Sequence, residues 1–256
     1  MTLSMPPIRP LLRRVRQYLG LAPKSAALYP ADFTDTEIAL CERMRRATLT
    51  SPERMISLYY AVRYVLDNAI PGAFVECGVY KGGSVMMMIE ALKERGAERP
   101  LYLYDTYEGM PAPGEHDVKF DGRSVAEKFN ALKISETSSH WINAGLEEVR
   151  GNVLGTGYPE HLCHFIKGMV EETIPATIPE QIALLRLDTD FYESTRHELT
   201  HLYPRLSPGG ILIIDDYGNF LGARKAVDEY FAAQPHKPLL QRIDTTGRLV
   251  IKTAAI

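Results

Sequence analysis

The sequence predicts a doubly wound α/β fold with a seven-stranded, mostly parallel sheet whose C-terminal strand runs antiparallel. Five short apolar runs are nearly continuous in Val, Ile, Leu and Tyr, which is typical of strands buried on both faces of a parallel sheet. Helical patterns alternate with these runs. At the C-terminus, two more runs flank the tight connection 244–247, which predicts a β-hairpin and therefore an antiparallel end to the sheet.

The predicted elements follow one another in this order. Two helices precede the sheet, over Asp35–Thr48 and Pro52–Ala69, and Ser51 is the expected N-cap of the second. The five parallel strands are Ala73–Cys77, Leu101–Tyr104, Cys163–Ile166, Ile182–Leu187 and Ile211–Ile214. The helices within the sheet region are Ser84–Glu94, Ser124–Leu132, Glu193–Leu206 and Leu221–Ala233, and the hairpin strands are Leu239–Ile243 and Arg248–Lys252.

The chain divides into two expected regions. Residues 1–49 form an N-terminal arm with helices, and residues 50–256 form the α/β domain. Within that domain, residues 111–162 are rich in Gly, Pro, Ser and charge, and an insertion of this length is typical of an active-site lid. The first 31 residues carry five basic side chains and no acid, which suits a membrane-surface helix near Leu11–Leu19 or a partly ordered arm that packs on a neighbouring subunit or stays loose. We favour the arm, and we expect a homo-oligomer without membrane contact.

The composition argues against several classes of function. The 256 residues carry 24% charged side chains and a net charge of −3, so nothing favours nucleic acid as a partner. No apolar run approaches the ~20 residues that cross a bilayer. Cys41, Cys77 and Cys163 form no CxxC pair, and the chain lacks the apolar core of a secretory signal, so we expect a reducing, cytoplasmic location.

A glycine-rich turn follows the first predicted strand and precedes a helix, where the backbone can approach a ligand. A dinucleotide fingerprint requires G-x-G-x-x-G, but the bulky Tyr80 occupies the second glycine position. The spacing of Glu76, Gly78 and Gly82 instead suits a ligand without phosphates. Asp105 ends the second strand, where a carboxylate can accept hydrogen bonds from both hydroxyls of a ribose. These four residues together disfavour a merely structural turn.

Two aspartate-rich segments each follow an apolar strand. Asp188 and Asp190 lie in the first, and Asp215 and Asp216 lie in the second. If the two strands are adjacent and parallel, the four carboxylates converge and repel one another. A hard divalent cation with oxygen ligands, Mg²⁺ or Mn²⁺, would relieve this repulsion. Helix capping could account for one of these aspartates, but hardly for all four.

Residues 197–201 match the HExxH pattern of zinc proteases. At about 100° per residue, Leu199, Leu202 and Leu206 form the buried stripe of the predicted helix. His197 and His201 then face roughly the opposite way, toward solvent rather than a cleft. We interpret the pattern as a chance match.

These motifs resemble those of the macrocin O-methyltransferase family, which modifies sugars and phenols on bacterial natural products. The resemblance covers about Thr50 to Lys252. It is carried by FVECGVYKGGS (Phe74–Ser84), YDTYEGMPAP (Tyr104–Pro113), LRLDTDFYEST (Leu185–Thr195), LYPRLSPGGILIIDDYG (Leu202–Gly218) and GARKAVDEYF (Gly222–Phe231). It implies a Rossmann-like class I methyltransferase fold, S-adenosyl-L-methionine as methyl donor, and Mg²⁺.

The resemblance also implies roles for individual residues. Asp188, Asp215 and Asp216 would hold the metal, with Asp188 also at the catalytic centre, and Asp190 is the candidate general base. The segment with Thr50 and Arg54 would close over the cofactor. The cofactor site would be lined by Glu76, Gly78, Val79, Tyr80, Ser84, Asp105, Lys167 and Gly168.

The expected function is Mg²⁺-dependent O-methylation of a hydroxyl on a small sugar or glycoside. The lid stretch Ser138–Val149, with the single tryptophan Trp141, is not a clear part of the family pattern, so the acceptor stays open. A metal-dependent phenol O-methyltransferase is one alternative. A non-catalytic cofactor-binding scaffold is another, and the four intact aspartates count against it. Tyr80 disfavours a nucleotide-sugar dehydrogenase or epimerase.

Overall fold

The computed structural model describes residues 29–253, so the predictions for the basic arm lie outside the described residues. Contacts divide the chain between Leu40 and Cys41 into two units, and the sheet belongs to the second. In the first unit, Thr34 and Glu37 form a capping box: Glu37 accepts a hydrogen bond from the Thr34 amide, and Thr34 Oγ1 accepts one from the Glu37 amide. The division into residues 1–49 and 50–256 stays a prediction.

The predicted sheet is confirmed, with seven strands in the order β3-β2-β1-β4-β5-β7-β6. Strands β1 to β5 run parallel, β7 pairs antiparallel with β5, and β6 pairs antiparallel with β7. The chain winds outward from β1 on one side and from β4 on the other, so β1 and β4 flank the topological switch point where such sheets bind ligands. The strands are β1 Ala73–Cys77, β2 Leu101–Asp105, β3 Cys163–Lys167, β4 Ile182–Leu187, β5 Leu206–Ile214, β6 Gln241–Arg242 and β7 Arg248–Ile251.

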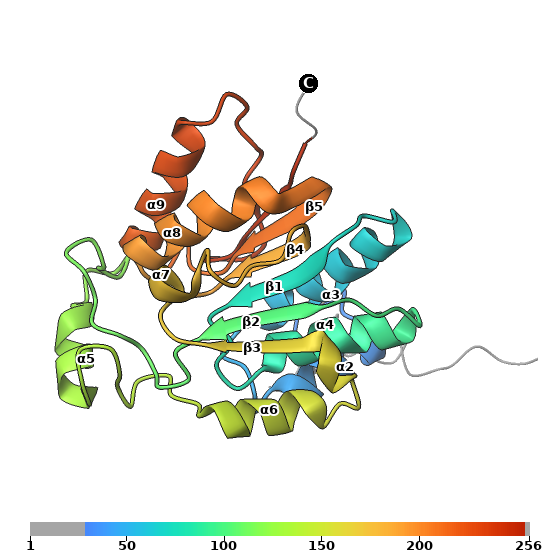
Figure 1. The fold of residues 1–256 in the computed structure, drawn as a ribbon, viewed down its shortest axis with the longest axis horizontal. Helices are drawn as coiled ribbons and strands as arrows, with labels where there is room; N and C mark the ends of the chain where they lie inside the picture. Colours follow the sequence, from blue (N-terminus) through green and yellow to red (C-terminus); the bar gives the residue numbers. More distant parts are fainter. Residues whose placement is uncertain (1–28, 254–256) are drawn as a thin grey trace, which may run out of the picture. The chain divides into compact units, whose positions relative to one another are not determined.

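Helices cover both faces of the sheet (Figure 1). On one face α3 packs against α4 and α4 against α6, and on the other α7 and α9 pack against α8. Because both faces are covered, every residue of β1 and β4 is buried. The helices are α2 Asp35–Met44, α3 Pro52–Asp67, α4 Gly83–Glu94, α5 Val125–Leu132, α6 Leu146–Leu154, α7 Val170–Thr173, α8 Tyr192–Leu202 and α9 Leu221–Ala232, with 3₁₀ turns η2 Glu160–Leu162 and η3 Tyr203–Arg205.

The predicted boundary between the helix Glu193–Leu206 and the fifth strand is wrong. This helix was expected to reach Leu206, but α8 ends at Leu202 and Leu206 already begins β5. Pro204 explains the early end, because proline cannot donate the intrahelical hydrogen bond and its ring clashes with the preceding turn. The first helix is also shorter than expected and ends at Met44.

The region predicted as a lid, residues 111–162, shares a small apolar core with segments that follow β2 and β4 and with the start of α9. It contains α5 and also α6, a helix that the sequence analysis did not predict. Figure 1 shows α5 away from the sheet, on the side that the carboxyl end of β1 faces. Beneath it lies an apolar cluster of lid and strand-end residues: Met110, Val125, Phe129, Trp141, Phe191, Phe220 and Ala223. The lid is therefore anchored by burial of aromatic and aliphatic side chains.

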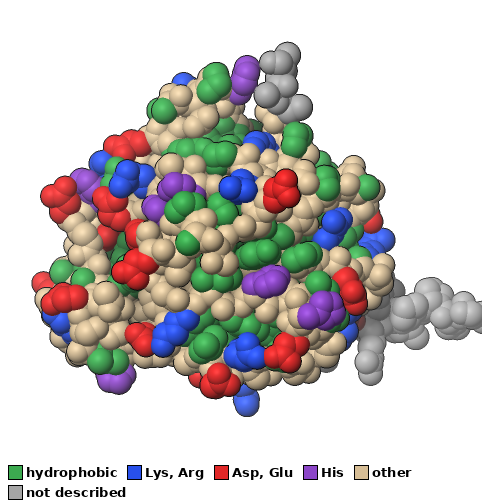
Figure 2. All heavy atoms as spheres, in the orientation of Figure 1, with side chains coloured by type: hydrophobic (Ala, Val, Ile, Leu, Met, Phe, Trp, Pro, Cys, Tyr) green, Lys and Arg blue, Asp and Glu red, His purple; other side chains and the backbone are tan. Residues whose placement is uncertain are grey.

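The outer surface shown in Figure 2 carries Lys and Arg interspersed with Asp and Glu. Within residues 29–253, no helix is both long and apolar enough to cross a membrane.

Candidate active site

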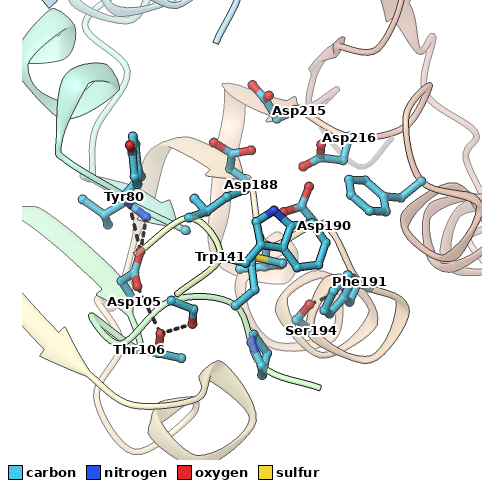
Figure 3. A pocket seen from close by; sticks show the side chains of 18 of the residues that line it. Tyr80, Asp105, Thr106, Trp141, Asp188, Asp190, Phe191, Ser194, Asp215 and Asp216 are labelled. Atoms are coloured by element: carbon cyan, nitrogen blue, oxygen red, sulfur yellow. Dashed lines mark hydrogen bonds between the residues drawn. The ribbon is translucent and has the colours of Figure 1, made fainter. Parts of the chain in front are cut away.

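A cavity of about 580 Å³ lies at the carboxyl ends of the parallel strands. Its walls come from the loops that follow β1, β2, β4 and β5, from the segment before α3, and from the lid. Figure 3 shows side chains from these loops turned toward one another, with Tyr80 and Asp105 at one end and Asp190 and Trp141 at the other. The cavity thus occupies the switch point between β1 and β4.

Most of the residues that the sequence analysis singled out line this cavity. They are Gly78, Val79, Tyr80, Ser84, Asp105, Gly168, Asp188, Asp190, Asp215 and Asp216. Glu76 and Lys167 are not among the lining residues. Glu76 is fully buried behind the cavity and pairs with Arg186, and Lys167 pairs with Glu108 at 2.6 Å near the surface. For these two residues, direct contact with a cofactor stays a prediction, and their positions outside the cavity lining do not support it.

Three carboxylates converge at the ends of β4 and β5. Asp188, Asp215 and Asp216 each offer one oxygen, and these oxygens lie within 4.8 Å of one another. Backbone hydrogen bonds between neighbouring strands continue beyond the strand ends and position these aspartates. The Asp188 amide donates to the Cys77 carbonyl, and the Asp215 amide donates to the Leu187 carbonyl, both at 2.9 Å. No other cluster of this kind occurs among the residues that the structure describes.

Asp190 and Asp216 have strongly perturbed acidities. Burial raises the pKa of Asp190 to about 7, and the charge of Asp188 adds to this effect. Burial also raises the pKa of Asp216 well above its ordinary value, together with the charges of Asp190 and Asp188. Asp216 Oδ2 is buried and has no hydrogen-bond partner within the described chain. A carboxylate oxygen with no partner, next to two other carboxylates, fits a bound hard cation.

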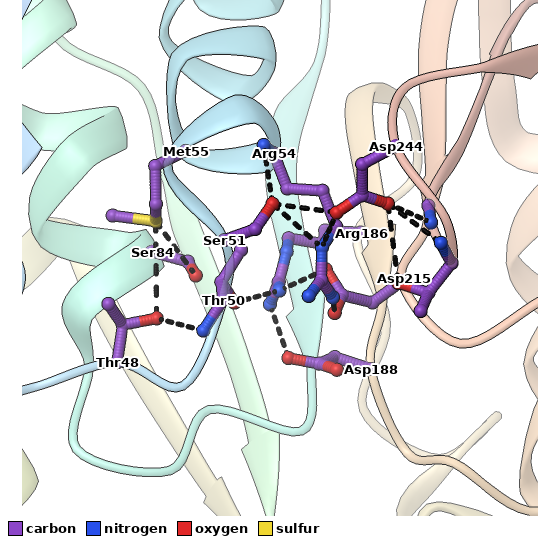
Figure 4. Close-up of polar contacts among 12 residues, drawn as sticks. Thr48, Thr50, Ser51, Arg54, Met55, Ser84, Arg186, Asp188, Asp215 and Asp244 are labelled. Atoms are coloured by element: carbon purple, nitrogen blue, oxygen red, sulfur yellow. Dashed lines mark hydrogen bonds and ion pairs between the residues drawn. The ribbon is translucent and has the colours of Figure 1, made fainter. Parts of the chain in front are cut away.

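Two arginines form ion pairs with Asp188 and Asp215, two of the three converging carboxylates (Figure 4). Arg186 on β4 is 1% exposed, and it pairs with Asp188 at 2.7 Å, with Asp215 at 2.5 Å, and with Glu76. Arg54 on α3 bridges Asp215 and Asp244, the latter at 2.9 Å. Arg186 was not among the predicted site residues, although a lone charge inside the apolar run Ile182–Leu187 is itself a signal of a functional or paired group.

These ion pairs also affect the pKa values of the buried groups Arg186 and Glu76. Burial would lower the pKa of Arg186, but the charges of Asp188 and Glu76 outweigh it and raise that pKa. Burial raises the pKa of Glu76 to about 7, although Arg186 acts in the opposite direction. Arg186 therefore stays charged and holds Asp188 and Asp215 in place.

At the opposite end, Asp105 organises the loop after β1. Its Oδ2 accepts hydrogen bonds from the amides of Val79 at 2.7 Å and Tyr80 at 3.0 Å, and its Oδ1 accepts one from Tyr107 at 2.7 Å. A ribose hydroxyl would therefore share these oxygens with the backbone. Gly78 has φ +82°, and a Cβ there would overlap the Asp188 carbonyl, so only glycine permits this contact between loops.

The third part of the cavity is an aromatic wall. Trp141 from the lid, Phe191 after β4 and Phe220 before α9 follow one another, with ring centroids 6.3 Å and 5.9 Å apart. All three side chains line the cavity and are at most 4% exposed. The wall lies beside Asp190, as Figure 3 shows for Trp141 and Phe191, and this is where an acceptor ring would pack.

The HExxH residues do not form a metal site in the described chain. His197 contacts the Ile174 carbonyl through Nε2 at 2.8 Å, and its ring lies 4.4 Å from that of His201. Both histidines are half-buried rather than solvent-facing as predicted, and neither lines the cavity. Glu198 points to the interior and is fully buried.

Comparison with known proteins gives consistent matches. The family model described as macrocin O-methyltransferase matches residues 40–251. A Streptomyces olivaceus protein described as 8-demethyl-8-(2,3-dimethoxy-alpha-L-rhamnosyl)-tetracenomycin-C 4'-O-methyltransferase is 34% identical over 209 residues, covering 81% of this chain and 76% of that protein. The demethyldecarbamoylnovobiocin O-methyltransferase of Streptomyces niveus is 33% identical over 202 residues, covering 78% and 73%.

A solved structure matches as well. The structure of the O-methyltransferase NovP superimposes with a TM-score of 0.70 at 30% sequence identity, covering 81% of this chain and 83% of that one.

Proposed function

The chain belongs to the macrocin O-methyltransferase family, with a class I methyltransferase fold and S-adenosylmethionine as methyl donor, and on this premise we propose that it methylates a sugar hydroxyl of a natural product with the help of Mg²⁺. The main observation in favour of a bound metal is that Asp188, Asp215 and Asp216 converge at the cavity. The partnerless Asp216 oxygen supports it further.

The cofactor supplies an activated methyl group, and the protein has to bring an acceptor oxygen in line with it and exclude water. Bound at the three aspartates, Mg²⁺ would act as a Lewis acid that lowers the pKa of an acceptor hydroxyl. Asp190 lies beside these ligands with its pKa near 7, so its carboxylate is suited to take the hydroxyl proton at neutral pH. The aromatic wall and the buried lid core keep water from the acceptor side.

The cofactor itself would lie at the end of the cavity formed by Gly78, Val79, Tyr80, Ser84 and Gly168. The turn there brings the backbone to the start of α4, and Gly82 at φ +85° precedes that helix. Asp105 fixes the Val79 and Tyr80 amides, and thereby the shape of this end.

A sugar acceptor is supported by the relatives. The Streptomyces olivaceus relative is described as methylating the 4'-oxygen of a rhamnosyl group. A phenol acceptor is the second candidate, since the wall of Trp141, Phe191 and Phe220 would also stack on a planar ring. We expect the enzyme to act in the cytoplasm on a small molecule.

A methyl-transfer screen tests the proposal. The full chain is incubated with tritiated S-adenosylmethionine and a panel of sugars, glycosides and phenols, with Mg²⁺ or with a chelator. Label in glycosides that requires Mg²⁺ supports the proposal. Label in phenols alone would favour the second candidate, and full activity after exhaustive chelation would refute the metal.

Substitution of Asp188 gives the sharpest prediction for this site. Asp188→Asn should lower turnover at least ~1,000-fold, because it removes a metal ligand and a partner of Arg186, yet leave the affinity for S-adenosylhomocysteine within about threefold. Turnover and calorimetric cofactor binding are measured together. Asp67→Asn, an exposed aspartate paired with Arg95, is the matched control and should resemble the wild type. A variant that keeps a tenth of the activity would contradict the assignment.

A further inference from the structure

Two lysines flank the aromatic wall at the acceptor end of the cavity. Lys128 on α5 places its Nζ 4.5 Å from the ring centroid of Trp141, and Lys119 places its Nζ 5.2 Å from that of Phe220. Both side chains line the cavity, although they lie in different parts of the lid. The aromatic faces hold two ammonium groups at one end of the cavity by cation–π attraction.

Neither ammonium group has a carboxylate partner in the part of the chain that the structure describes. Most lysines nearby differ in this respect: Lys133 pairs with Glu136 and Lys225 with Glu229. Burial, and then the like charge of Lys119, lowers the pKa of Lys128, so the two charges lie close enough to disfavour each other. Two cations kept together without a carboxylate in contact with either of them favour an anion between or beside them.

The acids near these lysines are engaged elsewhere. Asp117 accepts hydrogen bonds from the amides of Gly114 at 2.7 Å and Tyr192 at 2.8 Å. Asp190 acts on both lysines only through space, since its charge raises the pKa of Lys128 and the charge of Lys119 lowers the pKa of Asp190. A divalent cation at Asp188, Asp215 and Asp216 would offset the negative charge of that cluster, so the lysines would remain unneutralised.

The backbone around the lysines is fixed. Residue 119 forms a bridge with Phe220, and the Lys119 amide donates to the Arg123 carbonyl at 3.4 Å. Ser124 caps α5 by accepting a hydrogen bond from the Glu127 amide at 3.2 Å, which positions the helix that carries Lys128. The two charges are therefore held by the lid and do not depend on a loose loop.

We propose that Lys119 and Lys128 bind an anionic group on the acceptor, a phosphate ester or a carboxylate, while the sugar ring packs on the aromatic wall. The inference rests on the proposed function and narrows its substrate class to acidic or phosphorylated sugars. Lysine binds phosphate and carboxylate as a point charge, so both groups satisfy the same chemistry.

Binding measurements with three related hexoses, two anionic and one neutral, test the inference. Glucose 1-phosphate, glucuronic acid and methyl glucoside are titrated into the full chain with S-adenosylhomocysteine and Mg²⁺, and binding is followed by calorimetry and by the emission of Trp141, the single tryptophan. At least one anionic sugar should bind tenfold or more tightly than methyl glucoside, and this preference should weaken as salt rises. Glucose 1-phosphate and glucuronic acid separate the phosphate from the carboxylate.

Variants assign the preference to the two lysines. The double variant Lys119→Gln/Lys128→Gln should lose the tenfold preference, and Lys119→Arg/Lys128→Arg should retain most of it. Lys133→Gln is the matched control, because Lys133 also lies near a lid ring, Phe129, but is outside the cavity lining. Unchanged affinity for S-adenosylhomocysteine shows that each variant is folded.

Three results would overturn the inference: equal affinity for charged and neutral hexose, binding of none of the three, or a preference that survives in the glutamine variant. Methyl transfer is measured separately, in the screen with tritiated S-adenosylmethionine. Anion binding without any methylated glycoside would contradict the proposed function, whereas methylated neutral glycosides without anion preference would contradict only this inference.

Discussion

Glu198 is a fully buried carboxyl group directly behind the loop that carries Asp188 and Asp190. Its Oε1 accepts a hydrogen bond from Thr189 Oγ1 at 3.0 Å, and its Oε2 has no partner among residues 29–253. Burial raises the pKa of Glu198 well above its ordinary value, which favours the neutral, protonated form of this carboxyl group. A neutral carboxyl group can support the loop without adding to the charge of the aspartate cluster.

The raised pKa of Glu198 makes the stability of the fold depend on pH. In the unfolded chain this group ionises at about 4.3, whereas in the folded chain its pKa lies well above that value. The unfolded state therefore loses its proton first, and stability is lost as pH rises above about 4.3 toward the folded pKa. Glu198→Gln removes this effect, so its Tm relative to the wild type should rise between pH 5 and pH 8. Glu193→Gln, on the exposed side of the same helix, is the control, and a pH-independent difference would contradict the prediction.

Gly78 provides a second prediction for a single residue. Gly78→Ala should lower the free energy of unfolding by more than ~4 kcal/mol, because the new Cβ meets the Asp188 carbonyl in addition to the backbone strain at positive φ. Gly122→Ala is the matched control: its φ is +78°, nothing lies within 4 Å, and we expect a cost of about 1 kcal/mol. Urea unfolding measures both. Similar costs for the two variants would show that the contact between loops is unimportant.

Among the elements, the start of α3 connects the segment before the sheet to the C-terminal hairpin. Ser51 Oγ accepts a hydrogen bond from the Arg54 amide at 3.2 Å, and its hydroxyl donates to Asp244 Oδ2 at 2.7 Å. Asp244 also accepts from the amides of Thr246 and Gly247, which forms the turn between β6 and β7. Although burial opposes it, hydrogen bonds from Ser51 and Gly247 and the charge of Arg54 lower the pKa of Asp244 to about 2. Helix cap and hairpin turn thus share one carboxylate.

Removal of this cap should cost more than removal of an isolated one. Ser51→Ala loses the cap, about 1 kcal/mol, and a hydrogen bond to a charged group, about 1.5–3 kcal/mol, so we expect a total of roughly 2–4 kcal/mol. Ser124→Ala loses only the cap of α5 and should cost about 1 kcal/mol. Chemical denaturation compares the two variants, and equal costs would mean that the bond to Asp244 contributes nothing.

At the scale of the whole molecule, the metal site that we propose at the aspartate cluster would link metal binding, protonation and folding. Mg²⁺ at 100 times its Kd should stabilise the fold by about 2.7 kcal/mol, which raises Tm by roughly 5–10 °C. With the pKa of Asp190 near 7 and that of Asp216 raised, protons compete with the cation at lower pH. The shift in Tm should therefore be large at pH 8 and small at pH 5.5. Asp188→Asn should abolish the shift at both, and a pH-independent shift in the wild type would contradict this coupling.

Assembly belongs to the same scale and stays a prediction, as does the role of the basic N-terminal arm. We expect a homo-oligomer, with the N-terminal arm and the helices before the sheet as the candidate contact surfaces.

The sequence by itself determined the sheet and the residues at its carboxyl edge. Apolar runs buried on both faces have few alternatives to a parallel sheet, so β1 and β4 were predicted residue for residue. A loop that directly follows such a strand inherits its position, and for that reason Asp188, Asp215 and Asp216 could be placed together. Local chemistry also fixed the Ser51 cap.

Only the tertiary structure decided which arginines pair with these residues and how the lid packs. The ion-pair partners of Arg186 lie in β1 and just after β4 and β5, and the ion-pair partners of Arg54 lie more than 150 residues away in the sequence. No local pattern therefore indicates these pairs. The lid lacks a clear periodicity because its core, from Val125 to Phe220, is assembled from separate segments. Local propensity and periodicity act over a few turns, whereas ion pairs and lid packing depend on contacts that exist only once the chain has folded.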